Sequence, residues 1–551
     1  TAQNCFDALT EYYSLEDFSK EEALKIASVY FSMKRADFSK ANPFTFSENV
    51  PEEIVLILKE QSRFYKGVEV KIDTSREYYD GTIAPHIVGY YDFLDANEYK
   101  TVTTQYNEKI NNNNLSEDER NDLKLRAYSI TDKIGKFGIE NAMEESLRGK
   151  NGVMTTVTNA DGTKTRTVTI EPENGNNVIL TFNADFQKRV QNILFSRIES
   201  LKDESEVAAA GSIVVLNVSD FSVLACATYP SYDLSTYKQN AAELNTDETA
   251  PLWNRALRST YAPGSTVKPA VAIAGLEEGI VEPDTPIPCD IYYTYFKDQV
   301  FQCFNNNRHA GTPQTVETAI KNSCNSYFYE VGRQLGIGRM ADYFSSFGLG
   351  RKTGVELTEA TGVIAGPEER KAAGGIWYPG DVVQAAIGQS DNLFTPIQLA
   401  SYVATLANGG TKYKTHFIKA VKSADYSQTV YENQAEAVSK INISDKSKAA
   451  VKKGMIALGN SYSAFDALPY EVACKTGTAQ IKKKVNGTLV EYTNGFMIAY
   501  APADNPQIAI AVAIENSKSA GIANYVAEIC NAYFEQDSGV NQSQKPNTIL
   551  K

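Results

Sequence analysis

The chain has 551 residues, of which 42% are hydrophobic and 22% are charged, so it is long enough for several domains of ordinary globular composition. Its formal net charge of −13 at pH 7 argues against a polyanion-binding surface, so we expect no nucleic acid partner. No stretch approaches the ~20 uncharged apolar residues of a membrane span, and the seven scattered cysteines do not indicate a disulfide framework.

Residues 1–205 are predicted to form an elongated N-terminal pedestal (dimerisation-type) domain that mixes helices and strands. Ser116 with a glutamate three positions later is a capping box, which predicts the start of a helix. Alternating side chains on both sides of Asp161-Gly162 predict a β-hairpin. Apolar residues at helical spacing then predict a helix over 186–198.

A stretch of acidic and small residues at 203–210 marks the predicted boundary to a second domain, residues 206–535. Short apolar runs at both ends of this domain are typical of buried strands, and the pattern between them is mostly helical. This order predicts an α+β fold, in which an antiparallel sheet is flanked by helices. The strands are expected at 212–216, 223–225, 470–480, 494–500 and 507–514. The polar residues 536–551 are predicted to be a disordered tail.

Three short motifs carry the chemistry, and the first is Ser265 followed by Lys268. A turn ending at Gly264 precedes the serine, so we expect Ser265 at a helix start, with Lys268 on the same helical face. A serine hydroxyl is a poor nucleophile unless a base takes its proton, and a desolvated lysine can do so. Taken alone, the motif fits an N-capping serine beside a solvated lysine better.

The second motif, Ser323-Cys324-Asn325, follows a predicted helix over 316–321 and precedes another that opens at Tyr327. A loop between these helices would present a hydroxyl that can relay a proton and an amide that can orient a peptide backbone. Taken alone, an ordinary helix-capping Ser/Asn pair explains this motif better.

The third motif, Lys475-Thr476-Gly477-Thr478, lies in a predicted strand. Because side chains alternate along a strand, Lys475 and Gly477 share one face and the two threonines share the other. Gly477 lets a substrate backbone approach closely, and the Thr478 N–H can pair with that of Ser265 as an oxyanion hole. Taken alone, the motif fits a sheet-edge lysine beside a bulge glycine. The three motifs in this order, however, are the signature of serine acyl-enzymes that act on β-lactams and D-Ala-D-Ala peptides.

With these motifs the chain resembles the class B penicillin-binding proteins, the monofunctional peptidoglycan D,D-transpeptidases, and among them the elongation-type members. The resemblance runs from Gly67 to about Asn531, and the composition, rich in Asn, Lys and Tyr, is typical of a clostridial member. Ser390 departs from the family pattern, which has glycine after Gly388-Gln389. The further segments that carry the resemblance are 76–79, 86–90, 135–140 and 147–149 in the N-terminal part, and 227–233, 254–256, 261–264, 387–389, 395–398 and 407–410 in the C-terminal part.

The resemblance implies an acyl-transfer enzyme whose chemistry needs no cofactor. Ser265 would be the acylated nucleophile and Lys268 its general base. Ser323 and Asn325 would relay the proton and orient the peptide, and Lys475 with the two threonines would bind the substrate carboxylate and the oxyanion. The expected partners are D-Ala-D-Ala stem peptides of peptidoglycan, β-lactams and a membrane glycosyltransferase. The expected location is the extracytoplasmic face of the bacterial cell membrane, with an anchor helix upstream of this chain.

Three other functions would use the same residues. A D,D-carboxypeptidase would pass the acyl group to water instead of an amine. A β-lactamase would need a well-placed deacylating water, and no obvious Glu-x-x-Leu-Asn segment offers one. A β-lactam sensor or scaffold would use acylation as a signal, or would dock partners through residues 1–205.

A metal site is also predicted between the first two motifs. Cys289 and Cys303 flank an aromatic-rich stretch, and His309 follows. Together with the carboxylate of Asp290 they offer a tetrahedral donor set for a structural zinc ion, and Asp298 is the substitute if Asp290 points away. The alternatives are a disulfide between the two cysteines and unlinked thiols, and zinc is favoured over either.

Overall fold

The structure is a computed structural model, and it describes the chain outside residues 1, 37, 40–42, 48–49, 62, 71–75, 113, 159–163, 203–209, 304–308, 486–487, 518–520 and 539–551. It divides into two compact units, Thr1–Ser75 and Arg76–Lys551. Among the described residues, no helix has both the length and the apolar composition that a membrane crossing requires.

The first unit contains α1 (Ala2–Tyr12), α2 (Lys20–Arg35) and α3 (Glu52–Glu60). A small apolar core forms where α1 and α2 meet, and its buried members are Leu15, Ala23 and Ala27. Ser19 starts α2 with a capping box, which satisfies main-chain N–H groups at the helix start.

Residues 76–180 begin the second unit. They contain α4 (Pro85–Val88), β1 (Tyr90–Phe93), α5 (Ala96–Ile110), α6 (Glu117–Leu125), β2 (Lys133–Phe137), α7 (Gly138–Ala142), α8 (Glu144–Leu147), β3 (Val153–Thr158), β4 (Lys164–Ile170) and β5 (Asn177–Leu180). The capping box predicted at Ser116 is present at the start of α6. The predicted hairpin is formed by β3 and β4, and its Asp161-Gly162 turn lies outside the described residues.

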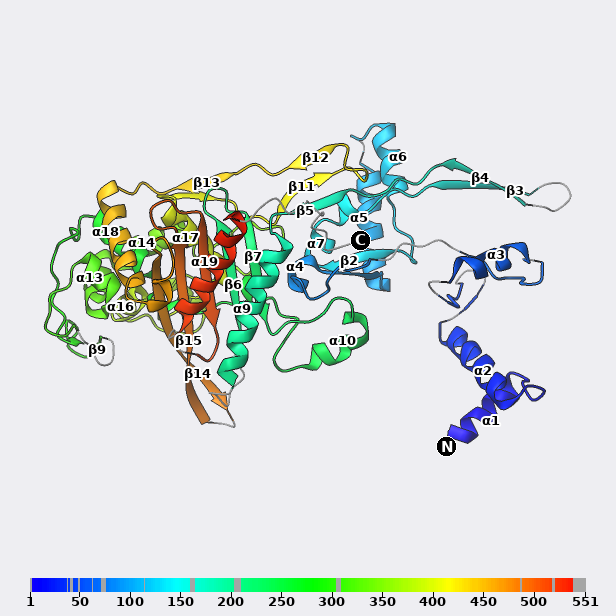
Figure 1. The fold of residues 1–551 in the computed structure, drawn as a ribbon, viewed down its shortest axis with the longest axis horizontal. Coiled ribbons are helices and arrows are strands. Elements are labelled where there is room, and N and C mark those ends of the chain that lie inside the picture. Colours follow the sequence, from blue (N-terminus) through cyan, green and yellow to red (C-terminus); the bar gives the residue numbers. More distant parts are fainter. Residues whose placement is uncertain are drawn as a thin grey trace. The chain divides into compact units, whose positions relative to one another are not determined.

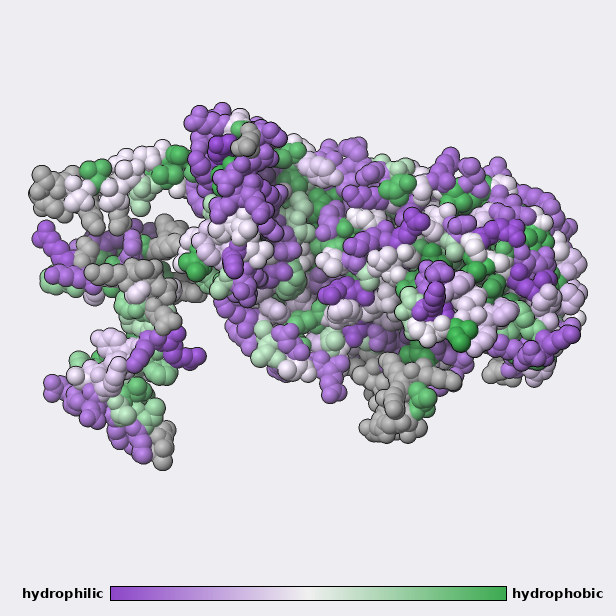
Figure 2. Space-filling view, turned by 180° about the vertical axis from the view of Figure 1, so that it is seen from behind, coloured by the Kyte–Doolittle hydropathy of each residue, from purple (hydrophilic) through white to green (hydrophobic). Residues whose placement is uncertain are grey.

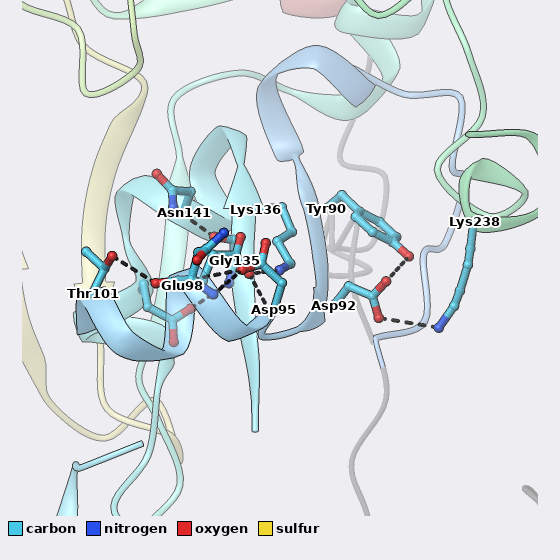
Figure 3. A network of polar contacts seen from close by, with 11 residues as sticks. Tyr90, Asp92, Asp95, Glu98, Thr101, Gly135, Lys136, Asn141 and Lys238 are labelled. Carbon is cyan, nitrogen blue, oxygen red and sulfur yellow. Dashed lines mark hydrogen bonds and ion pairs between the residues drawn. The ribbon is translucent and has the colours of Figure 1, made fainter. Parts of the chain in front are cut away.

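A polar network ties β1, β2 and α5 together (Figure 3). The carboxylate of Asp95 caps α5 by accepting hydrogen bonds from main-chain N–H groups of its first turn. The Glu98 carboxylate in turn accepts a hydrogen bond from the Asp95 N–H at 2.8 Å and forms an ion pair with Lys136 of β2. Lys238 reaches across from the C-terminal part of the unit and pairs with Asp92 at 3.3 Å. The strand pair β1–β2 is therefore tied both to α5 and to the segment that contains Lys238.

The C-terminal part is built on a five-stranded antiparallel sheet with the strand order β14-β15-β16-β6-β7 (Figure 1). Its strands are β6 (Gly211–Asn217), β7 (Val223–Tyr229), β14 (Ala473–Val485), β15 (Thr488–Ala501) and β16 (Ile508–Ile514). The strands predicted at the two ends of this domain thus meet in one sheet, as expected. β14 lies at the edge of the sheet, with β15 as its neighbour.

Helices surround this sheet. They are α9 (Ala184–Lys202), α10 (Tyr237–Thr246), α11 (Arg255–Arg258), α12 (Lys268–Glu277), α13 (Val316–Lys321), α14 (Asn325–Ser346), α15 (Pro367–Ala372), α16 (Asp381–Ala386), α17 (Pro396–Ala407), α18 (Asp445–Gly459) and α19 (Ile522–Ser538), with the 3-10 turns η1 (Gly264–Val267) and η2 (Ser463–Phe465). α9 and α19 pack on one face, and α11 and α17 pack on the other. The α+β prediction is therefore confirmed. α9 contains the predicted helix 186–198, and α19 runs past position 536, where the tail was expected to begin.

Short strands complete this part: β8 (Tyr292–Tyr293), β9 (Phe301–Gln302), β10 (Thr411–Tyr413), β11 (Ile418–Lys422), β12 (Thr429–Glu432) and β13 (Ala437–Lys440). β11 pairs with both β12 and β5, so residues 177–180 join a sheet with residues far along the chain. On the face shown in Figure 2, hydrophilic residues predominate and apolar residues are interspersed among them, as on most globular proteins.

Candidate active site

Ser265 lies in the 3-10 turn η1, which leads directly into α12, so it occupies a helix start as predicted. Gly264 has a φ of +54°, and its N–H donates to the carbonyl of Gly388 at 2.9 Å. Farther along, the Ala270 N–H donates to the hydroxyl of Tyr402 at 3.0 Å. The turn is therefore held from outside the helix on both sides of the serine.

Lys268 is fully buried, and its Nζ donates to three oxygens of the second motif. These are Asn325 Oδ1 at 2.6 Å, the main-chain oxygen of Ser323 at 2.7 Å and the Ser323 Oγ at 3.3 Å. Burial lowers the pKa of Lys268 from 10.5 to about 8, because the charged form loses its hydration. A usable fraction of this amine is therefore neutral near physiological pH, as a general base requires.

The second motif lies in the turn between α13 and α14, where it was predicted. α13 has the predicted bounds, whereas α14 begins at Asn325 rather than at Tyr327, because the Cys324 sulfur caps it by accepting from the Tyr327 N–H. Ser323 has a φ of +51°, in the left-handed region that residues with a side chain rarely adopt. Strain of this kind is concentrated at functional sites.

Lys475 approaches the same hydroxyl from β14. Its Nζ donates to Ser323 Oγ at 3.0 Å and to the main-chain oxygen of Thr476 at 2.8 Å. Lys475 is fully buried, and its pKa is lowered first by burial and then by the neighbouring Lys268. Because two adjacent buried amines repel each other when both are charged, a proton shared between them can move through the Ser323 hydroxyl.

Gly477 places β14 directly against the turn η1 (Gly264–Val267), the serine turn. A Cβ at Gly477 would lie 2.6 Å from the Pro263 oxygen and 2.9 Å from Thr266 Cγ2, so no side chain fits there. A Cβ at Gly264 would likewise lie 3.0 Å from the Thr478 oxygen and 3.2 Å from its nitrogen. The main chain of Thr478 therefore runs beside the turn that carries Ser265, the predicted nucleophile, which is where the prediction places a second oxyanion-hole N–H.

Thr476 lies on the other face of the strand, as the alternation predicted. Its side chain hydrogen-bonds with Tyr462, a residue just before η2 that the sequence did not single out. Burial raises the pKa of Tyr462, and the hydrogen bond with Thr476 opposes that shift. The expected contact of Thr476 with a substrate carboxylate stays a prediction.

The predicted metal ligands converge in part. Cys289, Cys303 and His309 form a cluster with Cys324, and their ligand atoms all lie within 4.8 Å of one another. Cys303 Sγ lies 3.7 Å from His309 Nε2 and 3.9 Å from Cys324 Sγ. The two cysteines considered for a disulfide are not joined by one. Three thiols and one imidazole are a donor set that suits zinc.

Asp290 does not belong to this cluster, and neither does its substitute Asp298. Cys324 takes the fourth position instead. The sequence pattern did not single it out as a ligand, because it lies inside the second motif, between Ser323 and Asn325. A third cysteine inside a catalytic motif, shortly after a Cys/Cys/His group, is the signal that would have found it.

Comparisons with known proteins agree with this geometry. Residues 211–535 match the family described as penicillin binding protein transpeptidase domain, and residues 1–180 match the penicillin-binding protein dimerisation domain. Peptidoglycan D,D-transpeptidase MrdA of Haemophilus influenzae is 29% identical over 533 residues, which cover 92% of this chain and 76% of that protein.

Two solved structures share the fold. One, from work on the structural coordination of polymerization and crosslinking by a peptidoglycan synthase complex, has 27% identity and a TM-score of 0.69, and the match covers 94% of this chain and 86% of the other. The second is penicillin-binding protein PBP2 of Helicobacter pylori in complex with MreC, with 21% identity, a TM-score of 0.72, and coverage of 98% and 93%. With a dimerisation domain followed by a transpeptidase domain, the chain belongs to the class B penicillin-binding proteins.

Proposed function

We propose that this chain is a peptidoglycan D,D-transpeptidase that crosslinks stem peptides through an acyl-enzyme on Ser265, and that β-lactams inhibit it by acylating the same serine. The observation that carries this proposal is the meeting of two buried lysines, Lys268 and Lys475, at the hydroxyl of Ser323. This arrangement supplies both a base for the nucleophile and a route for its proton. The activity named for the MrdA relative is the same.

In the acylation step, Ser265 Oγ attacks the carbonyl carbon of the penultimate D-Ala, and its proton passes to neutral Lys268. The N–H groups of Ser265 and Thr478 stabilise the oxyanion that forms. The C–N bond to the terminal D-Ala then breaks, and the leaving nitrogen takes a proton from Lys268 through the Ser323 hydroxyl. The product is an ester between Ser265 and the donor stem, and free D-Ala leaves.

In the second step, an amine from a neighbouring stem attacks the ester carbonyl. Lys268 accepts a proton from this amine, the new peptide bond forms, and Ser265 Oγ leaves and regains a proton. Lys475 binds the carboxylate of the terminal D-Ala in the first step, because an anion beside it restores the charged form that burial disfavours. Asn325, whose Oδ1 already accepts from Lys268, orients the amide of the donor.

We propose that Cys289, Cys303, His309 and Cys324 hold a structural zinc ion. When bound, the metal supplies a cross-link between the segment 289–309 and the turn of the second motif. The Asn325 N–H donates to Cys303 Sγ at 3.2 Å, so this cluster touches a residue of the proposed catalytic set directly. The chain's own acyl-transfer chemistry needs no cofactor.

We further propose a membrane glycosyltransferase partner and a location on the extracytoplasmic face of the cell membrane. The two similar structures support an assembly of this kind, since one concerns coordinated polymerization and crosslinking and the other a complex with MreC. Residues 1–205 are the proposed pedestal domain and residues 206–535 the transpeptidase domain. The carboxypeptidase and sensor alternatives differ from this function in what resolves the acyl-enzyme, not in how it forms.

The test is intact-mass analysis after treatment with benzylpenicillin. One adduct should form on the peptide that contains Ser265, and Ser265→Ala should abolish it, while Ser259→Ala, in the same segment, should not. A thioester donor with an acceptor amine then separates the functions. Crosslinked product supports a transpeptidase, hydrolysed donor a carboxypeptidase, and a stable adduct without turnover a sensor. An adduct that persists in Ser265→Ala would exclude the assignment.

A further inference from the structure

Ser390 adopts a main-chain conformation that residues with a side chain rarely take. Its φ is +61°, in the left-handed region where the Cβ crowds the following carbonyl oxygen. The family pattern described above has glycine at this position, and glycine adopts such a φ without strain. An outlier of this kind, close to a catalytic turn, calls for a group that holds it in place.

The loop that contains Ser390 forms the support of the serine turn. The carbonyl of Gly388 accepts the hydrogen bond from the Gly264 N–H, at 2.9 Å. The two glycines touch so closely that a Cβ on Gly388 would lie 2.0 Å from the Gly264 oxygen. A few residues later, Phe394 exchanges two main-chain hydrogen bonds with Tyr261, at 2.8 and 2.9 Å. A shift of this loop would therefore move the residue that immediately precedes Ser265.

Arg370, from α15, holds the loop from its outer side. Its Nη2 donates to Ser390 Oγ at 3.0 Å and to Asp381 Oδ1 at 3.4 Å, and its Nε pairs with the carboxylate of Asp391. One planar guanidinium thus joins α15, the start of α16 and two consecutive loop residues. Such a fork needs the fixed geometry of arginine, which a lysine ammonium does not have.

The inner side of the loop is held independently. Asn392 is fully buried, and its Nδ2 donates to the carbonyls of Ala385 and Gln389 at 3.0 and 3.2 Å. Its Oδ1 accepts from the Ala365 N–H at 2.9 Å. Loss of Arg370 therefore should not unfold the loop, but it removes the side-chain contact that holds Ser390 in its left-handed conformation.

We propose that Arg370 is a positioning residue for the transpeptidase reaction. Its hydrogen bond to the Ser390 hydroxyl stabilises the left-handed turn, which fixes the Gly388 carbonyl and, through the Gly264 N–H, the placement of Ser265. This inference rests on the proposed role of Ser265 as nucleophile. Because Arg370 acts on the nucleophile and not on the ligand, its loss affects the chemical step of acylation and leaves the prior non-covalent binding of a β-lactam intact.

The experiment measures the binding constant K and the acylation rate constant k2 separately, by stopped flow with a fluorescent penicillin. Arg370→Ala should lower k2 by about tenfold, the scale of one charge-assisted hydrogen bond, and leave K unchanged. Arg370→Lys should recover only part of this loss. Arg339→Ala is the matched control, because Arg339 also pairs with a carboxylate, that of Glu278, while its other hydrogen bonds go to main-chain oxygens within α14. It should leave both constants unchanged.

A double-mutant comparison tests whether Arg370 acts through Ser390 or only stabilises the fold in general. Ser390→Gly should keep k2 near its normal value, whereas Ser390→Ala, which retains the strain without the hydrogen bond, should lower k2 several-fold. In the Ser390→Gly background, Arg370→Ala should lower k2 by much less than tenfold. Should Arg370→Ala not fold, the Ser390 variants carry the test, since they leave the ion pairs of Arg370 with Asp381 and Asp391 in place.

Three results would overturn the inference. Arg370→Ala could lower k2 equally in the wild-type and Ser390→Gly backgrounds, it could change K alone, or Ser390→Gly and Ser390→Ala could have equal k2 values. A wild-type protein without an adduct at Ser265 would instead overturn the proposed function. The two failures are therefore distinguishable.

Discussion

The depressed pKa of Lys268 makes the acylation rate dependent on pH in a defined way. With a pKa of about 8, the neutral fraction of this amine is about one tenth at pH 7 and about nine tenths at pH 9. If neutral Lys268 takes the proton of Ser265, the acylation rate should rise about tenfold between these pH values and level off above them. Lys268→Arg should be slow throughout, because a guanidinium does not lose its proton.

The same shift predicts how stability varies with pH. In the unfolded chain Lys268 titrates near 10.5, so between pH 8 and 10.5 the unfolded state binds more protons than the folded state, and stability rises with pH. Below pH 8 the buried amine is charged, and its burial then destabilises the folded state by on the order of 3 kcal/mol. The difference in melting temperature between Lys268→Met and the wild type should therefore change across pH 8 to 10.5 and be constant below it.

The assay is stopped-flow acylation with a fluorescent penicillin, run across this pH range together with thermal unfolding. Lys321→Arg, an exposed lysine at the end of α13, is the control and should keep the wild-type profile. An acylation rate that stays flat from pH 7 to 9, or near-normal acylation by Lys268→Arg, would refute the reasoning.

The remaining predictions concern the third motif and the thiol cluster. Gly477→Ala should slow penicillin acylation by tenfold or more (about 1.4 kcal/mol in the barrier), since its Cβ would lie 2.6 Å from a main-chain oxygen of the serine turn, while Gly338→Ala, which meets nothing within 4 Å, should not. Lys475→Gln should weaken acylation by a penicillin roughly tenfold or more, and should weaken acylation by the neutral ester of that penicillin far less. Equal losses for the acid and the ester in competition assays would contradict a role of Lys475 in binding the carboxylate. Elemental analysis should find about one zinc per chain, lost on acidification and in Cys324→Ser but kept in Cys5→Ser; metal-free protein with unchanged melting temperature and acylation would disprove the zinc proposal.

Local chemistry explains what the sequence predicted well. The helix over 316–321 has its predicted bounds, and the capping box at Ser116 starts α6, because caps and apolar spacing act within a few residues. The three predicted catalytic motifs meet, and each lies close to the end of an element whose type could be recognised. Lys475 and Gly477 share one face of β14 by strand alternation alone.

What the sequence did not reveal depends on contacts between distant residues. The pairing of β5 with β11 joins segments near 178 and 420, and no local pattern specifies such a partner. Cys324 completes the thiol cluster from another element, while Asp290, adjacent to Cys289, lies outside it. The support of the serine turn by Gly388 likewise depends on two loops that meet only after folding.

The edge position of β14 has a consequence for how drug resistance can arise. A peptide that binds alongside an edge strand is recognised through main-chain N–H and C=O groups, as an added strand would be. Every substitution except one to proline leaves these groups in place, so selection has few direct ways to delete them. Variants that discriminate between a β-lactam and a stem peptide must therefore change the depth, width or rigidity of the site around Ser265. The loops that hold the serine turn set that rigidity, so substitutions there change acylation without altering the main chain of β14.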